Sequence, residues 1–212
     1  MGDTQTALVI GTGLIGGSIA GGLRAAGWDV TGHDADPDAS STAMSLELID
    51  RHVDDVAPVV ADGVDLIVVA APPKATIEVL SQLSTDTVVM DVAGVKSAVS
   101  HAAAHLPRFV ATHPMAGRET SGPTAANAAL FAGATWVVIE GADPSARIAV
   151  VSVIESLGAT PVEMDAEAHD RSVALISHLP QLVAGGLLAA AKASPEALDL
   201  AAGSFRDLTR VG

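Results

Sequence analysis

A glycine-rich segment near the start of the chain has the residue types and spacing of a phosphate-binding loop. Residues 11–16 read Gly-Thr-Gly-Leu-Ile-Gly and match the pattern G-x-G-x-x-G. An apolar run over residues 7–10 precedes them, and a helical pattern follows. The first glycine would make a tight turn, the second would admit a pyrophosphate, and the third would let helix and strand pack closely. The segment therefore predicts a dinucleotide site at a helix N-terminus, although an ordinary tight turn fits the glycines alone.

A carboxylate follows the loop at the distance that a ribose contact requires. Asp34 comes after the next short β-rich run, about 20 residues beyond the glycines, where it would accept hydrogen bonds from the adenosine ribose. Asp36 and Asp38 follow, and neither Arg nor Lys occurs between Asp34 and Asp50. A 2′-phosphate would meet only negative charge there, so we expect NAD as cofactor, with another nucleotide on a Rossmann-like fold as the alternative. The predicted cofactor residues are Gly11, Gly13, Leu14, Ile15, Gly16, Asp34, Ala71 and Pro72.

His113 is the candidate catalytic residue because of its place in the chain. It directly follows an apolar run over residues 109–112, and residues just past the carboxyl ends of strands line the ligand crevice of open α/β sheets. A neutral imidazole with a pKa of about 6.5 can accept a proton from a substrate hydroxyl near neutral pH. A surface or capping histidine is the alternative that the spacing alone leaves open.

Metal and thiol chemistry find no support in the sequence. The chain has no cysteine, which removes disulfides, thiolate ligands and cysteine nucleophiles. His101 and His105 form an i, i+4 pair, but no third ligand lies near them in the sequence. His169 and His178 fall on different faces of a helix. We therefore expect no metal site.

The elements that must position these residues alternate between strand and helix. A helix is expected over residues 14–26, ended by Gly27. Short apolar runs are typical of strands buried on both faces of a parallel sheet, and their alternation with helices predicts a Rossmann-type doubly wound α/β fold. The expected strands cover residues 7–10, 28–32, 66–69, 88–92, 109–112 and 136–139.

The predicted secondary structure changes after about residue 165, where strand patterns end. Residues 166–193 show helical periodicity alone, and Pro180 is expected to kink the helix or restart it. We therefore expect a dinucleotide-binding domain over residues 1–164 and the start of an all-helical domain over residues 165–212.

Composition restricts the partners of the protein. The chain has 212 residues, 49% of them hydrophobic, and a formal net charge of −14. The apolar fraction allows a sizeable core, and the charge repels nucleic acid and anionic membranes. Residues 5–23 are uncharged but rich in glycine, unlike a membrane span or a signal peptide. We expect a cytoplasmic protein with no nucleic-acid or membrane partner; a salt-rich cytoplasm remains open.

Four segments together resemble the prephenate/arogenate dehydrogenase family, in the family's order. The resemblance implies NAD-dependent oxidative decarboxylation in tyrosine biosynthesis, giving 4-hydroxyphenylpyruvate from prephenate or, alternatively, tyrosine from arogenate. A hydroxyacid or imine reductase of similar build and a nucleotide-sensing module without catalysis are the rivals. The segments are residues 11–18 (GTGLIGGS), 113–122 (HPMAGRETSG), 169–181 (His-Asp, then SHLPQ) and 203–210 (GSFRDLTR).

The resemblance also implies a substrate site around the catalytic His113. An Arg fork suits one of the two substrate carboxylates, although spacing alone would make Arg210 a solvated residue near the chain end. The implied substrate-binding residues are Arg210, His178, Gln181 and Gly94.

The chain departs from the family pattern in three places. Gly94 stands where the family typically has a Ser near the catalytic His, so a water or the Thr112 hydroxyl is expected to replace it. Gln181 stands where many prephenate-specific members have His, which leaves substrate side-chain recognition and tyrosine feedback open. Relatives continue after the Arg210 motif with helices that form a homodimer interface, so we expect a truncated chain.

Overall fold

A computed structural model describes residues 4–210 of the chain. The chain divides into two compact units, with the boundary between Glu167 and Ala168. The first unit contains both sheets, and the second is entirely helical in the residues described.

A six-stranded parallel sheet organises the first unit. Its strand order is β3-β2-β1-β4-β5-β6, and β1 pairs with both β2 and β4, so the direction of winding reverses between β1 and β4. Ligands of open α/β sheets bind in the crevice at the carboxyl ends of the strands where this reversal occurs. The strands are β1 (Thr6–Ile10), β2 (Asp29–His33), β3 (Arg51–His52), β4 (Leu66–Val69), β5 (Val88–Asp91) and β6 (Phe109–Val110).

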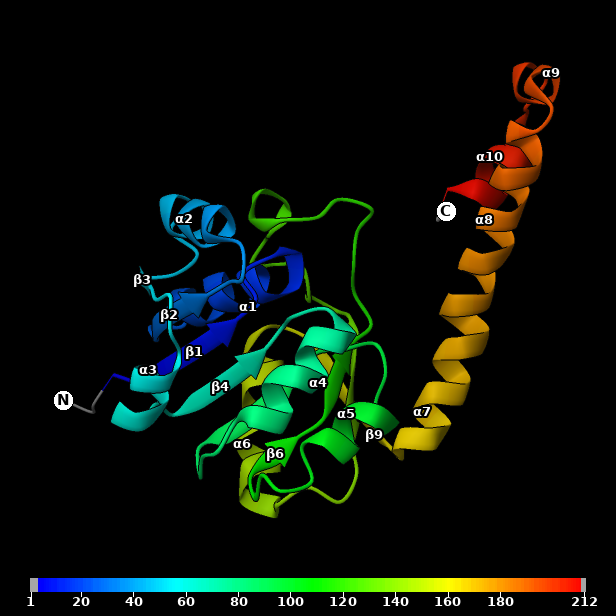
Figure 1. The fold of residues 1–212 in the computed structure, drawn as a ribbon. Helices are drawn as coiled ribbons and strands as arrows, with labels where there is room; N and C mark the ends of the chain where they lie inside the picture. The colour runs from blue at the N-terminus through cyan, green and yellow to red at the C-terminus, as the bar shows by residue number, and fades with distance from the viewer. Residues whose placement is uncertain (1–3, 211–212) are drawn as a thin grey trace. The chain divides into compact units, whose positions relative to one another are not determined.

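Helices cover both faces of this sheet, which confirms the doubly wound α/β prediction. Alternate strand residues enter two separate cores, because successive side chains of a strand point to opposite faces. Ala7 and Val9 pack with residues of α1 and α6, while Leu8 and Ile10 pack with residues of α4 and α5; α4 and α5 lie in front of the sheet in Figure 1. The helices are α1 (Leu14–Ala25), α2 (Pro37–Ser45), α3 (Ala57–Asp62), α4 (Pro73–Gln82), α5 (Ser97–Ala102) and α6 (Pro144–Ser156).

A second, three-stranded sheet corrects the prediction of six strands in one sheet. It contains β7 (Thr112–Pro114), β8 (Thr135–Ile139) and β9 (Thr160–Met164), with β8 antiparallel to β7 and parallel to β9. Residues 109–112 are therefore not one strand: β6 ends at Val110 and Thr112 begins β7. The sixth strand of the parallel sheet is β3, whose two exposed residues show no apolar run. A short 3-10 helix, η1 (Pro123–Ala125), lies between β7 and β8.

The second unit is built on one long helix. Figure 1 shows residues 166–192 as a continuous helix with α10 beside α8. A five-residue π-helix stands before Pro180, which occupies the first turn of α8, so the α-helical pattern restarts at the predicted place. The elements are α7 (Ala166–Val173), the π-helix η2 (Ala174–His178), α8 (Leu179–Lys192), α9 (Pro195–Asp199) and α10 (Gly203–Thr209).

The long helix leaves large apolar side chains exposed. Among the described residues, Ala166–Lys192 is one helix long and apolar enough to cross a membrane, with 27 residues and a mean hydropathy of 1.6 in its most apolar window. Only 11% of that window is buried. The exposed apolar residues of this helix are Leu175, Ile176, Leu179, Leu182 and Val183.

Candidate functional site

The glycine loop joins β1 to α1 at the carboxyl edge of the sheet. Gly11 has a φ of +97°, and a Cβ there would lie 2.5 Å from the Ala70 carbonyl oxygen. A Cβ on Gly16 would lie 1.8 Å from the Gly11 carbonyl oxygen, so only glycine lets α1 approach the loop this closely. A Cβ on Gly13 would meet no described heavy atom within 4 Å. The first and third glycines thus serve packing, and the second leaves space beside the N-terminus of α1.

Asp34 lies directly after β2 and is held by the glycine loop. Its Oδ2 accepts hydrogen bonds from the Thr12 backbone N–H at 2.7 Å and from the Thr12 hydroxyl at 3.2 Å. Its Oδ1 accepts from the Asp36 backbone N–H at 3.0 Å. The carboxylate is half-buried, and its Oδ1, with a single donor, keeps a lone pair for a further donor.

The loop, Asp34 and the ends of β1, β4 and β5 surround one cleft with a volume of about 480 Å³. This is the crevice that the strand order predicts. Seven of the eight predicted cofactor residues line it, and the eighth, Gly16, lies behind the loop as a packing glycine. Gly94 lines the same cleft, together with Gly11, Gly13, Leu14, Ile15, Asp34, Ala71 and Pro72.

His113 lies next to the cleft wall that Gly94 forms. It is the central residue of β7, pairs with Val137 of β8, and is half-buried. A Cβ on Gly94 would lie 3.6 Å from the His113 Nε2 and 3.7 Å from its Cε1. The tertiary structure therefore brings together two predicted site residues, one from the loop after β5 and one from β7.

A buried polar network lies behind His113, and the sequence prediction assigned it no role. Asp91, Lys96 and Thr112 have no exposed surface. The Lys96 ammonium donates to the Asp91 carboxylate and, at 2.6 Å, to the Thr112 carbonyl. The Asp91 carboxylate also accepts from the backbone N–H groups of Ala93 and Thr112. The network thus ties the loop that carries Gly94 to the strand that carries His113.

The Thr112 hydroxyl belongs to this network. The sequence suggests it as a replacement for the Ser hydroxyl that the family has near the catalytic His, and its contacts correct that expectation. It donates to the Asp91 carbonyl at 2.5 Å and accepts from the Trp136 Nε1–H at 2.9 Å. These bonds engage the hydroxyl in the buried interior. It therefore does not replace the missing Ser hydroxyl beside His113.

The charge of Asp91 depends on this arrangement. Burial raises the pKa of the Asp91 carboxyl above its ordinary value, and the Lys96 ammonium and the two backbone N–H donors oppose that effect. A lysine inside an apolar stretch, following an aspartate at a strand end, is the sequence signal that could have revealed the pair.

The remaining predicted substrate residues lie in the helical unit. His178 ends the π-helix, Gln181 lies in the first turn of α8, and Arg210 follows α10. All three are exposed within the described chain. His169, from the same motif, shares a 2.9 Å hydrogen bond with Asp170 through its Nδ1.

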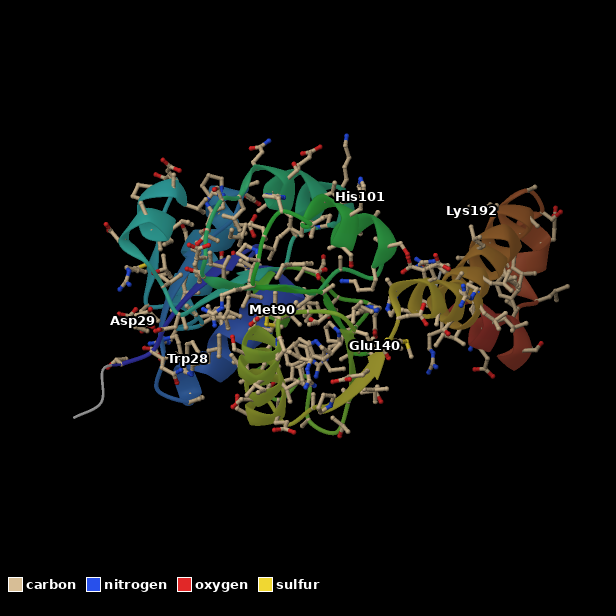
Figure 2. The ribbon with its side chains drawn as sticks, turned by 90° about the horizontal axis from the view of Figure 1, so that it is seen from below. Trp28, Asp29, Met90, His101, Glu140 and Lys192 are labelled. Atoms are coloured by element: carbon tan, nitrogen blue, oxygen red, sulfur yellow. The ribbon has the colours of Figure 1, made fainter. Side chains whose placement is uncertain are left out.

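Residues 4–210 contain no cluster of three or more His, Cys, Asp or Glu side chains that could hold a metal ion. His101 is exposed on α5 (Figure 2). His105 shares a hydrogen bond with the Leu83 carbonyl through its Nε2 at 2.8 Å.

Comparison with known families matches both units of the chain. Residues 19–163 match the family described as "Prephenate dehydrogenase, nucleotide-binding domain", and residues 165–212 match "Prephenate dehydrogenase, dimerization domain". The prephenate dehydrogenase of Lactococcus lactis is 33% identical over 96% of this chain and 60% of its own length.

Solved structures give the same likeness. The prephenate dehydrogenase of A. aeolicus in complex with hydroxyphenyl propionate and NAD+ is similar at a TM-score of 0.89 and 29% identity, over 99% of this chain and 78% of its own. The arogenate dehydrogenase of Synechocystis is similar at a TM-score of 0.80 and 32% identity, over 98% and 79%. The chain spans 50% to 60% of the length of the first three curated relatives.

Proposed function

Because the chain belongs to the prephenate dehydrogenase family, we propose that it forms the NAD-binding and catalytic part of a dehydrogenase that acts on prephenate. The reaction converts prephenate and NAD+ into 4-hydroxyphenylpyruvate, carbon dioxide and NADH. The observation that carries the proposal is the cleft, which joins the glycine loop and Asp34 to Gly94, the neighbour of His113.

The residues of the cleft fit NAD. The open space at Gly13, beside the helix N-terminus, suits a pyrophosphate, because free N–H groups and the helix dipole favour negative charge. Asp34 offers the free lone pair of its Oδ1 to the ribose hydroxyls. A 2′-phosphate would meet Asp34, Asp36 and Asp38 instead, so we propose a preference for NAD over NADP. When bound, NAD supplies the hydride acceptor.

His113 is proposed as the general base. Loss of hydride turns the substrate's ring hydroxyl into a carbonyl, so its proton becomes acidic, and a neutral imidazole can accept it. The ring carboxylate leaves as carbon dioxide, and the electron pair of the broken C–C bond stays in the ring and completes its aromaticity. The ring oxygen, now a phenolate, takes the proton back from the imidazolium. The hydrogen bonds of Asp91 and Lys96 to Thr112 hold the strand at His113. Arg210, His178 and Gln181 are proposed to bind the substrate's carboxylates and side chain, with Arg210 as the bidentate carboxylate ligand.

The test is turnover of prephenate with NAD, followed by NADH absorbance. His113→Asn should lower kcat by about two to four orders of magnitude, the range for loss of a positioned base, while the Kd for NAD stays unchanged. His101→Asn, on the exposed face of α5, is the matched control and should keep full activity. Near-parental turnover by His113→Asn would remove this residue from the mechanism.

Arogenate is the second candidate substrate, and one residue favours it. Gln181 is neutral and can accept a hydrogen bond from the ammonium that arogenate carries where prephenate has a ketone. A protonated histidine there would repel that ammonium. Assaying both substrates under the same conditions decides between them.

We further propose that residues 1–164 bind the cofactor and that residues 165–212 belong to a helical domain through which the protein forms a homodimer in the cytoplasm. The exposed apolar side chains of Ala166–Lys192 support this, since soluble monomers rarely expose large apolar surfaces. Light scattering should give a dimer mass. A monomer that sediments with phospholipid vesicles would favour a membrane instead.

A further inference from the structure

Thr12 fills the variable position between the first two glycines of the loop, and it is fully buried. Unlike Gly11, Gly13 and Leu14, it does not line the cleft. Its side chain therefore does not contact a ligand in the cleft directly. Within residues 4–210, the Thr12 hydroxyl hydrogen-bonds to Asp34, and Asp34 does line the cleft.

Both donors of Thr12 point at the same oxygen of Asp34. The backbone N–H lies 2.7 Å from Oδ2, and the hydroxyl oxygen lies 3.2 Å from it. Any residue except proline at position 12 would supply the N–H, whereas the second donor comes from the side-chain hydroxyl. With the Asp36 N–H on Oδ1, three donors fix the plane of the carboxylate.

The methyl group of Thr12 fixes the direction of its hydroxyl. A Cβ on Gly32 of β2 would lie 3.1 Å from the Thr12 Cγ2, so the methyl group packs against the strand at the position that lacks a side chain. A β-branched side chain has few χ1 rotamers. Packing of the methyl group against Gly32 therefore leaves the hydroxyl pointing at Asp34.

We propose that Thr12 is a positioning residue for cofactor selectivity: its hydroxyl holds the Asp34 carboxylate in the orientation that accepts the ribose hydroxyls of NAD and repels the 2′-phosphate of NADP. This inference rests on the proposed use of NAD and adds a residue to it. A carboxylate that is free to rotate can turn away from a phosphate, whereas a fixed one cannot. Loss of the hydroxyl should therefore weaken NAD binding while leaving NADP binding unchanged or slightly stronger.

Isothermal titration calorimetry of the chain with NAD and with NADP tests the proposal. Thr12→Val keeps the shape and removes the hydroxyl, so the Kd for NAD should rise about three- to tenfold, the effect of losing one hydrogen bond of ordinary strength. The ratio of the Kd for NADP to the Kd for NAD should fall by at least the same factor. Thr12→Ser keeps the hydroxyl but lacks the methyl group that directs it, so its Kd for NAD should lie between those of the parent and of Thr12→Val. Urea unfolding midpoints check that the variants fold.

A double-mutant cycle separates positioning from a merely structural role. In an Asp34→Ala background, Thr12→Val should leave the NAD-to-NADP ratio unchanged, because no carboxylate remains to orient. Thr12→Ala also lacks the hydroxyl and replaces Thr12→Val in the test if the valine variant does not fold. It too should lower the ratio of the Kd for NADP to the Kd for NAD. Equal weakening of NAD and NADP by Thr12→Val, or an unchanged ratio, overturns the proposal.

The proposed function fails separately. If the parent chain binds no NAD, or if Asp34→Ala binds it as well as the parent does, the assignment of the cofactor cleft is wrong and the role of Thr12 falls with it. If Asp34→Ala weakens NAD binding while Thr12→Val keeps the parental ratio, only the role of Thr12 is wrong.

Discussion

The two units of the chain treat their apolar side chains in opposite ways. In the first unit, strand residues such as Leu8 and Met90 are fully buried between layers of helices, and Figure 2 shows Met90 within this unit. In the second unit, Leu182 is 74% exposed and Leu175 is 65% exposed. The first unit therefore has a core of its own, whereas the second leaves large apolar side chains exposed, as the proposed dimer would require. Cofactor binding needs only the first kind of structure, and association needs the second.

Breaking the buried ion pair between Asp91 and Lys96 should have the largest effect, because it destabilises the core of the first unit. Lys96→Met leaves the Asp91 carboxylate without its cation in a fully buried site, so the free energy of unfolding should fall by about 3–5 kcal/mol. Urea unfolding of the chain measures this. Lys74→Met, at an exposed position of α4, is the matched control and should change stability by less than about 0.5 kcal/mol.

A second variant makes the result specific to the pair. Adding Asp91→Asn to Lys96→Met removes the unpaired charge and should recover a large part of the loss. A loss below about 1 kcal/mol in Lys96→Met would show that the pair does not hold the unit together.

Charged substitutions on the apolar helix test whether the second unit associates through its exposed apolar side chains. Leu175→Glu with Leu182→Glu places two charges on the exposed apolar surface, so self-association should weaken at least about tenfold, or about 1.4 kcal/mol. Light scattering across a concentration series measures it, and NAD affinity should not change. Leu46→Glu, also exposed but in the first unit, is the control. Unchanged association of the double variant would contradict an interface on this helix.

The choice between prephenate and arogenate should depend on Gln181, which lies in the helical unit. Gln181→His should shift the ratio of kcat/KM values toward prephenate by about three- to tenfold, roughly the worth of one hydrogen bond. Inhibition by tyrosine, which we expect to be weak in the parent, should strengthen. The Kd for NAD is the internal control, since the proposed cofactor cleft lies in the first unit. A parent that turns over prephenate exclusively would contradict the role of Gln181.

The smallest expected effect is at Gly94. A Cβ there makes only ordinary contact with the His113 ring, so Gly94→Ser should fold with unchanged stability. Its hydroxyl can hydrogen-bond to the imidazole and orient it, which should raise kcat about two- to fivefold. Gly94→Ala has the same Cβ without the hydroxyl and should not raise kcat. A tenfold loss in Gly94→Ser would show that the open space itself is needed.

Local rules account for the parts of the molecule that the sequence predicted well. The glycine loop, helix α1 and the position of Asp34 depend on backbone conformation and on spacing within a short stretch. The parallel sheet followed from apolar runs buried on both faces. The long helix and its restart at Pro180 followed from periodicity and from the missing proline N–H. The amino-acid sequence by itself therefore determined the fold class, the glycine loop and the place of each candidate residue along the chain.

Only the tertiary structure decided which distant residues meet. The chain leaves the parallel sheet after Val110 because buried Thr112 is bonded to Asp91 and Trp136, and no local pattern contains those contacts. The same long-range packing places Gly94 against His113 and the Thr12 hydroxyl against Asp34. Periodicity reports which side of an element is buried, but hydrogen-bond partners far apart in sequence are chosen when the layers pack, because each buried polar group must then find a partner.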